Sequence, residues 1–124
     1  MTEASRQAGG GPKGPGIDST VLAHGEMRLA VYRLAPGAEI PWHMHSVVND
    51  WYICREGRML VETRAPESVT ELAPGGMANV QARRPHRIRN VGAAPAAFAL
   101  VQGVGAYDFH PLKDLAVRSR ETGE

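Results

Sequence analysis

The sequence predicts a single all-β domain folded as a sandwich or a barrel. Short apolar runs alternate with turn signals rich in proline and glycine through most of its 124 residues, and no segment shows the repeat of an amphipathic helix. A chain of this length can bury one core of its own. Many short strands joined by turns pair with one another, in two packed sheets or in a closed barrel.

The two ends of the chain differ in composition from its middle. Residues 9–16 are almost all glycine or proline and offer little to bury. We therefore expect a flexible tail over residues 1–18, a β domain over residues 19–112 and a polar tail over residues 113–124. The strands expected inside the domain are residues 27–34, 51–54, 58–64, 77–80, 86–90 and 97–103.

Charge and composition limit the classes of binding partner that we expect for this chain. The formal net charge is +1 and the sequence pI is about 8.0, which gives no basic footprint for nucleic acid or for an anionic membrane. No apolar run approaches the roughly 18 residues of a membrane-spanning helix, and residues 1–15 lack the apolar core of a secretory signal. We expect a small-molecule partner and a cytoplasmic location. The single cysteine, Cys54, is consistent with a reducing compartment.

Three histidines indicate a metal site. His43 and His45 stand at positions i and i+2 of an extended segment, so both imidazoles point to the same face of the strand. Neutral imidazole is the commonest metal ligand in proteins. His86 lies far along the chain, as a third ligand from a separate strand would. His24, beside a glycine in an expected turn, and His110, near the C-terminus, have no such support.

The spacing around the first two histidines resembles that of a known family. Gly37, His43, His45, Asp50 and Gly57 follow the first motif of the small single-domain cupins, with aspartate where the family has glutamate. Two framing glycines and two histidines in register make this a specific match.

The second cupin motif is matched in part. Gly75, His86 and Asn90 fall in register, whereas Gln81 and Arg83 replace the family's proline and glycine. Glycine would allow a positive φ at that position, and arginine makes it costly. We therefore expect the loop that carries the third histidine to take a different path.

The resemblance implies a jelly-roll barrel, the double-stranded β-helix, with one divalent metal ion per chain. It gives His43, His45 and His86 as ligands, and iron, manganese, nickel, zinc or copper all suit such a donor set. Asp50 is one methylene shorter than glutamate, which leaves two alternatives. It completes the ligand set directly, or it acts through a water or orients a histidine.

Strand alternation adds further pocket residues. Tyr52 lies two residues after Asp50 on the same face of the strand, where its hydroxyl could donate a proton to the substrate or simply pack in the core. Asp50 and Tyr52 are the candidate catalytic residues. Gln102 is in phase with the apolar residues of its strand and could present an amide to the substrate. Arg84 could direct its guanidinium at a substrate carboxylate or stay solvated.

Other residues near the motifs have expected structural roles. Arg87 and Arg89 alternate with His86 and should be surface charges. Asn90 is expected to form hydrogen bonds or stabilise a turn. Cys54 shares the inward face and should behave as a small buried apolar side chain.

Trp51 and Ile53 alternate with the pocket residues, so their apolar side chains should point out of the barrel. An exposed apolar pair on a sheet is typical of a protein interface. Because small cupins commonly pair sheet to sheet, the resemblance implies a homodimer. The alternative is that the N-terminal segment folds over this pair.

Together these inferences favour a metal-dependent enzyme that acts on a small molecule. Among the reactions that the resemblance implies, a dioxygenase acting on a small oxygenated acid comes first, ahead of isomerase or lyase chemistry. The alternative from another class is a ligand-binding or sensing module without catalysis. The fold alone does not choose between them, because one fold supports unrelated functions.

Overall fold

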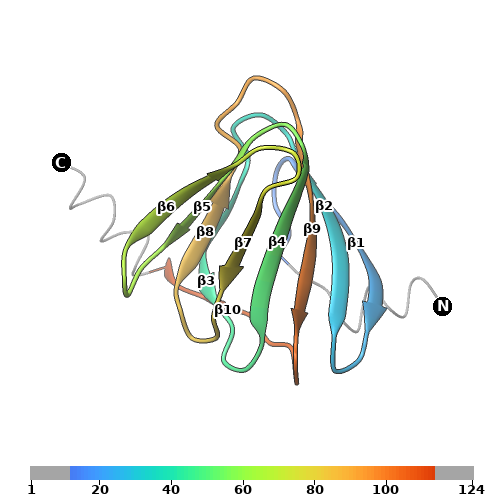
Figure 1. Ribbon diagram of the computed structural model, residues 1–124, viewed down its shortest axis with the longest axis vertical. Helices are drawn as coiled ribbons and strands as arrows, with labels where there is room; N and C mark the ends of the chain where they lie inside the picture. Colours follow the sequence, from blue (N-terminus) through green and yellow to red (C-terminus); the bar gives the residue numbers. More distant parts are fainter. Residues whose placement is uncertain (1–11, 114–124) are drawn as a thin grey trace.

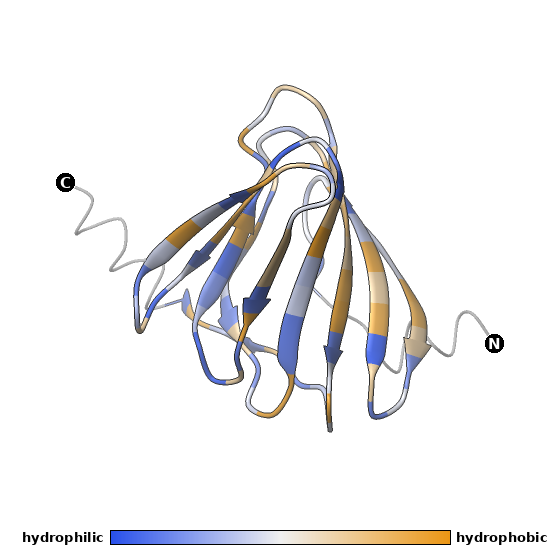
Figure 2. Ribbon diagram, viewed as in Figure 1, coloured by the Kyte–Doolittle hydropathy of each residue, from blue (hydrophilic) through white to orange (hydrophobic). Residues whose placement is uncertain are grey.

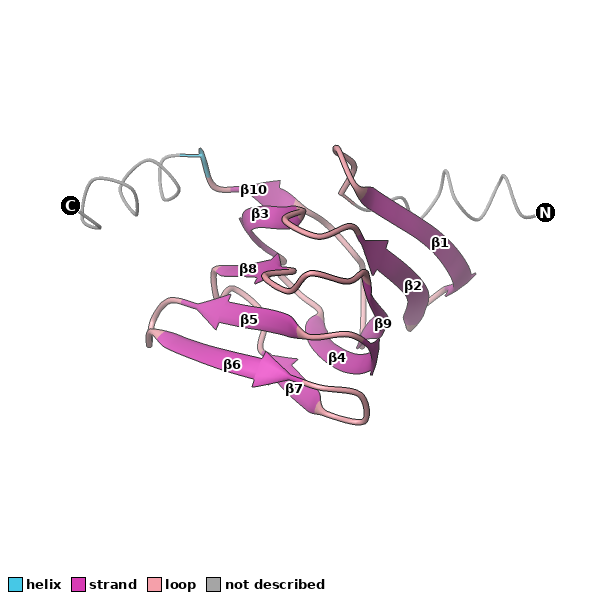
Figure 3. Ribbon diagram, turned by 90° about the horizontal axis from the view of Figure 1, so that it is seen from above, coloured by secondary structure: helices cyan, strands magenta, loops and turns pink. Residues whose placement is uncertain are grey.

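Residues 12–113 are described by the computed structural model, and they form two antiparallel sheets of five strands that face each other (Figure 1). Sheet A contains, in spatial order, β1 (Ile17–His24), β2 (Arg28–Leu34), β9 (Ala96–Gly103), β4 (Asn49–Glu56) and β7 (Met77–Val80). Sheet B contains β10 (His110–Pro111), β3 (Glu39–Met44), β8 (His86–Arg89), β5 (Met59–Thr63) and β6 (Ser68–Leu72). Figure 3 shows both sheets from above, with β6 and β7 side by side where they meet. This is the predicted jelly-roll barrel.

Each expected strand is present, and the differences lie at sheet edges. The sequence analysis missed β6, an edge strand on which every residue but Leu72 is exposed, because such a strand shows no apolar alternation. It also missed two other edge strands, β1 and the short β10. The strand β1 begins at Ile17, so the sheet includes two residues assigned to the N-terminal tail. The rest of that tail up to residue 11, and residues 114–124 of the C-terminal tail, lie outside the described residues.

The apolar core lies between the sheets. Along β2 and β9 every second side chain is buried, and the rings of Tyr32 and Phe98 stack with centroids 5.0 Å apart. Full burial of one large apolar side chain contributes about 1.5–3 kcal/mol. Figure 2 shows hydrophobic residues along β2, whereas the lower end of β4 is hydrophilic. Among residues 12–113, no helix reaches the length and apolar character that crossing a bilayer requires.

Glycine is required at two turns of the cupin-like spacing. Gly37 and Gly57 both have positive φ, at 82° and 69°. At Gly57 a Cβ atom would also lie 2.4 Å from the carbonyl oxygen of Pro95, so no larger residue fits there without a shift of the backbone. These turns fix where β3 begins and where β4 ends.

At one end of the barrel the inward-facing residues change from apolar to polar. This is the end where β9 stops and β4 starts, at the bottom of Figure 1. In sheet A, Arg28, Gln102 and Asp50 pair side by side across β2, β9 and β4. In sheet B, His43 pairs with His86 across β3 and β8. The two polar rows face each other across the barrel.

Candidate metal centre

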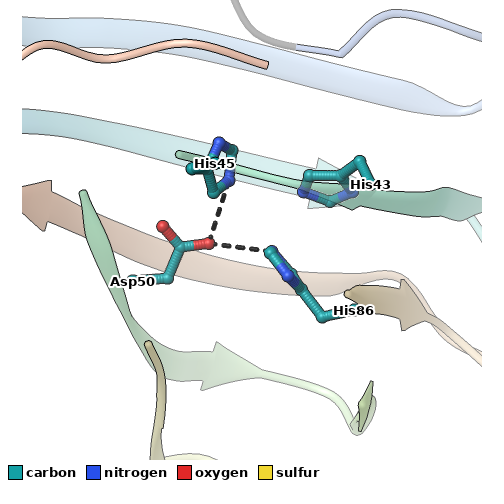
Figure 4. A group of neighbouring side chains, drawn as sticks. All are labelled: His43, His45, Asp50 and His86. Atoms are coloured by element: carbon teal, nitrogen blue, oxygen red, sulfur yellow. Dashed lines mark hydrogen bonds and ion pairs between the residues drawn. The ribbon is translucent and has the colours of Figure 1, made fainter. Parts of the chain in front are cut away.

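Four side chains converge at this polar end. His43, His45, Asp50 and His86 each offer one ligand atom, and these atoms all lie within 4.8 Å of one another. Figure 4 shows the three imidazoles and the carboxylate pointing toward a common centre. None of the four residues is more than 3% exposed. The structure therefore brings together all the metal ligands that the sequence predicted.

A bulge in β3 aims the first two histidines inward. The register between β3 and β8 shifts between Ile40 and His43. In a regular strand, residues three positions apart point to opposite faces, but the bulge turns Ile40 and His43 both toward the interior. Bulges commonly re-aim side chains next to functional sites in this way. His45 then follows two residues later on the same face, and Trp42 points to the outer face of sheet B.

Backbone carbonyl groups orient all three imidazoles. Each Nδ1 lies within hydrogen-bond distance of a carbonyl oxygen: His43 of Pro41 at 2.8 Å, His45 of Asp108 at 2.6 Å and His86 of Arg84 at 2.9 Å. Because a carbonyl oxygen can only accept, each Nδ1 carries a proton and donates it. In a neutral imidazole the lone pair then lies on Nε2. Metal-binding histidines usually have this second hydrogen bond, which fixes both ring orientation and tautomer.

Asp50 lies at the centre of the hydrogen-bond network. Its Oδ2 accepts a hydrogen bond from the Tyr52 hydroxyl at 2.7 Å and lies 3.0 Å from Nε2 of His86 and 3.2 Å from Nε2 of His45. The Gln102 amide nitrogen donates to Oδ1 at 2.9 Å. Tyr52 and Gln102 are therefore inward-facing pocket residues, as predicted, and both hold the carboxylate in place.

The pKa shifts of His43 and Asp50 favour metal ligation. Burial lowers the pKa of His43 well below its usual value, so this imidazole is neutral. Burial alone would raise the pKa of Asp50, but the interactions of its carboxylate with His45 and His86 outweigh this effect and keep the pKa below its usual range. Burial alone would lower the pKa of His45, and its interaction with Asp50 raises it instead. Asp50 is thus a carboxylate and His43 a neutral imidazole, the forms in which these groups ligate a metal.

The donor set fits a divalent metal ion. Three Nε2 atoms and one carboxylate oxygen face one another. Their lone pairs repel one another unless a proton or a cation lies between them. Imidazole and carboxylate donors suit iron, manganese, nickel, zinc and copper, and they do not select among these ions.

Sequence comparison identifies the family. The family model of the cupin domain matches residues 30–102. This chain belongs to the cupin family. No curated protein matches it. Several solved structures resemble it.

The solved structures show the same fold. A protein with a double-stranded β-helix domain from Klebsiella pneumoniae has a TM-score of 0.69 at 24% identity, over 79% of this chain and 85% of that one. A cupin from Silicibacter pomeroyi described as a sugar phosphate isomerase has a TM-score of 0.63 at 25% identity, over 71% of this chain and 59% of that one. An oxalate oxidase has a TM-score of 0.73 at 17% identity, over 87% of this chain and 61% of that one.

The cupin barrel is covered at its polar end by a segment that the sequence analysis missed. Residues 104–109, here called the strap, follow β9 and lead to β10, which pairs with β3. Within the strap, the Phe109 ring stacks on His43 with centroids 4.5 Å apart. The Asp108 side chain accepts hydrogen bonds from the Ser46 hydroxyl and from the Ser46 amide, the latter at 2.8 Å. Burial alone would raise the pKa of Asp108, but these bonds and the contact with His110 outweigh it and lower the pKa to about 2. Neither cupin motif includes the strap, so no motif could have indicated it.

The two arginines before His86 do not join the cluster. The Arg84 guanidinium donates to Thr63 Oγ1 at 2.8 Å and to the carbonyl oxygen of Pro66 at 2.9 Å, so it is directed at the loop after β5. Arg83 adopts the left-handed conformation with φ of 66°. The prediction that arginine would change the path of this loop was therefore wrong. The Arg83 amide donates to the carbonyl oxygen of His45 at 2.7 Å, a bond available in this conformation.

The structural roles expected for other motif residues are largely confirmed. The Asn90 amide donates to two backbone carbonyl groups and accepts from a third residue's amide, which holds the turn before β9. Cys54 is buried. Arg87 and Arg89 face away from the metal ligands, as predicted, but they are not simply solvated, because both donate to the buried carboxylate of Glu62. His24 and His110 lie outside the four-residue cluster.

Proposed function

We propose that this cupin is a metal-dependent enzyme that acts on a small organic acid. The observation that carries the proposal is the fixed orientation of three buried imidazoles. In each ring Nδ1 bonds a backbone carbonyl group, and Nε2 is directed toward the centre of the four-residue cluster. His43, His45 and His86 would hold the ion, with Asp50 as a further ligand or as a hydrogen-bond partner. The ion would supply Lewis-acid chemistry or, if it is redox-active, electron transfer.

The residues around the ligands have distinct tasks in this proposal. Tyr52 keeps its proton because burial and the charge of Asp50 raise its pKa well above the usual value, so it acts as a hydrogen-bond donor. Gln102 presents its amide between Asp50 and the interior of the barrel. Burial of all these groups excludes water from the reacting centre.

Two reaction classes follow. A dioxygenase acting on a small oxygenated acid remains our first candidate. An isomerase or lyase is the second, and the likeness to the Silicibacter pomeroyi cupin described as a sugar phosphate isomerase supports it. A ligand-binding module without catalysis is the alternative from another class, since the metal could also anchor a ligand that does not react.

The first test is the metal content of tag-free protein purified without added metal or chelator, measured by inductively coupled plasma mass spectrometry. We expect about one ion per chain, as a single donor cluster predicts. A His43→Ala/His86→Ala double variant should lose it, and His24→Ala, which removes an exposed histidine outside the cluster, should keep it.

The identity of the ion directs the activity screen. Iron would lead to measurements of oxygen consumption, and manganese, nickel or zinc to isomerase and lyase screens. Robust turnover without oxygen would exclude a dioxygenase. If neither the wild type nor the double variant holds metal after reconstitution, the metal-dependent enzyme is wrong and a metal-free binding module takes its place.

We also propose that two copies pair through the outer face of sheet A. Trp51 is 44% exposed and Met77 56% exposed, and Val101 and Ile53 lie beside them on adjacent strands. The alternative cover, the first residues of the chain, lies outside the described residues. Light scattering should show that the wild type is a dimer and that Trp51→Glu is a monomer. A monomeric wild type would contradict this proposal.

The cytoplasmic location also stays a prediction.

A further inference from the structure

The strap lies outside both cupin motifs and beyond the family match, which ends at residue 102. Three consecutive strap residues nevertheless contact the metal ligands. The backbone carbonyl group of Asp108 accepts the hydrogen bond from Nδ1 of His45 at 2.6 Å. The Tyr107 ring lies 5.5 Å from the His45 ring, centroid to centroid, and the Phe109 ring stacks on His43. A segment that follows the matched domain is therefore part of the surroundings of the metal centre.

His45 differs from the other two histidine ligands in the origin of its carbonyl partner. The partners of His43 and His86 are the carbonyl groups of Pro41 and Arg84, each two residues earlier in the chain. The local backbone therefore orients these two rings. The partner of His45 is 63 residues away, on the strap. Of the three imidazoles, only that of His45 depends on the strap for this hydrogen bond.

The side chain of Asp108 fixes the position of that carbonyl group. Its carboxylate accepts hydrogen bonds from the Ser46 amide at 2.8 Å and from the Ser46 hydroxyl. Because Ser46 directly follows His45, one strap residue bonds two consecutive residues, one through its carboxylate and the other through its carbonyl group. The carboxylate also lies 3.0 Å from Nε2 of His110, where β10 begins. These contacts hold the carbonyl group of Asp108 against the His45 ring.

We propose that Asp108 is a positioning residue of the metal centre: its carboxylate, through Ser46, holds the carbonyl group that orients His45. This inference rests on the proposed function. The hydrogen bond to Nδ1 fixes the ring orientation, places the lone pair on Nε2 and strengthens the imidazole as a ligand. Without that bond the ring can rotate and can take the other tautomer, in which Nε2 carries the proton and cannot bind a metal. Metal affinity therefore depends on the strap.

The first test is zinc affinity, measured by competition with a chromophoric chelator. Asp108→Ala should bind zinc about tenfold more weakly or worse, the order of effect of losing a partner that orients a ligand. Asp108→Asn keeps the shape and an oxygen that can accept from the Ser46 amide, so it should recover part of the affinity. Asp18→Ala is the matched control, because it makes the same change at an exposed aspartate of β1, and it should bind zinc as the wild type does.

The second test examines the rings one by one, by NMR of the imidazole Nδ1–H protons in the zinc-loaded proteins. A hydrogen bond to a carbonyl group slows the exchange of such a proton with water. In Asp108→Ala the Nδ1–H proton of His45 should exchange faster than in the wild type. Those of His43 and His86 should be unchanged, because their carbonyl partners are local. A general loosening of the barrel would affect all three protons.

Each outcome decides the proposal. A wild type that binds no zinc would overturn the proposed function and this inference with it. If the wild type binds zinc, unchanged zinc affinity in Asp108→Ala, or equally faster exchange at all three rings, would overturn the role of Asp108 alone. A purely structural Asp108 would lower the melting temperature of Asp108→Ala and leave zinc affinity and the His45 proton unchanged. If Asp108→Ala does not fold, Ser46→Ala, which lacks the hydroxyl donor, would contradict the proposal by matching the wild type in both tests.

Discussion

Two buried carboxylates in this cupin have different partners and therefore different uses. Asp50, inside the barrel, accepts hydrogen bonds from uncharged donors and faces two imidazole nitrogens. Glu62, on the outer face of sheet B, binds the guanidinium groups of Arg87 and Arg89. Both are nearly inaccessible, at 0% and 5% exposure. An imidazole can give up a proton and bind a metal, and a guanidinium can do neither, so only the inner cluster is open to a metal.

The outer cluster is closed by permanent charges. Each oxygen of Glu62 accepts from a different arginine, Arg87 through Nε at 2.9 Å and Arg89 through Nε at 2.8 Å. The Arg87 guanidinium also lies over the ring of Trp42 at 5.0 Å. Burial would raise the pKa of Glu62, but the two arginines outweigh it and lower the pKa. This cluster stabilises the sheet and offers no lone pair for a metal.

The largest test of the comparison is stabilisation by metal. Zinc at a thousand times its Kd should raise the free energy of unfolding by about 4 kcal/mol. Because the proposed metal site is the inner cluster, Glu62→Ala should keep this increment and His86→Ala should lose it. Thermal unfolding with and without zinc measures both. An increment that survives in His86→Ala would place the metal elsewhere.

The second test concerns Asp50 itself. Asp50→Asn keeps the shape of the side chain and removes its charge, so metal affinity should fall about 10- to 100-fold. Competition with a chromophoric chelator measures the affinity. The upper part of this range is expected if Asp50 is a direct ligand, and the lower part if it only orients the histidines. Unchanged affinity would exclude both roles.

The third test addresses the stability that the outer cluster provides without metal. Glu62→Ala leaves two partly buried arginines without their shared carboxylate, and should lower the free energy of unfolding by about 2 kcal/mol. Glu56→Ala is the control, because its pair with Arg33 is exposed on both sides and contributes about 0.5 kcal/mol or less. Urea unfolding of the metal-free proteins measures both values. Equal losses would show that burial of Glu62 does not matter.

The smallest effect is on pH dependence. Because the folded-state pKa of Glu62 is lowered, its contribution is complete above its unfolded value of about 4.3 and is lost as the pH falls through the folded pKa. The difference in unfolding free energy between wild type and Glu62→Gln should stay constant from about pH 7 to 5 and shrink toward pH 3. A difference that grows on acidification would contradict the lowered pKa.

The sequence by itself determined the fold and which four side chains form the candidate metal centre. Alternation along a strand is a local property with a period of two, so it placed Tyr52 and Gln102 on the inner face and the two arginines around Ile88 on the outer face. The spacing of the cupin motifs added the three histidines and Asp50. The same alternation could have indicated Arg28, which is in phase with buried residues of its strand.

Only the tertiary structure decided how these residues are oriented and covered. The carbonyl group that holds His45 belongs to Asp108, 63 residues away, and the ring on His43 belongs to Phe109. The link from Arg28 to the metal cluster passes through Gln102, 74 positions along the chain. A carbonyl oxygen is the same in every residue, and contacts between distant segments exist only once both sheets have formed. No local pattern in the sequence could therefore specify them.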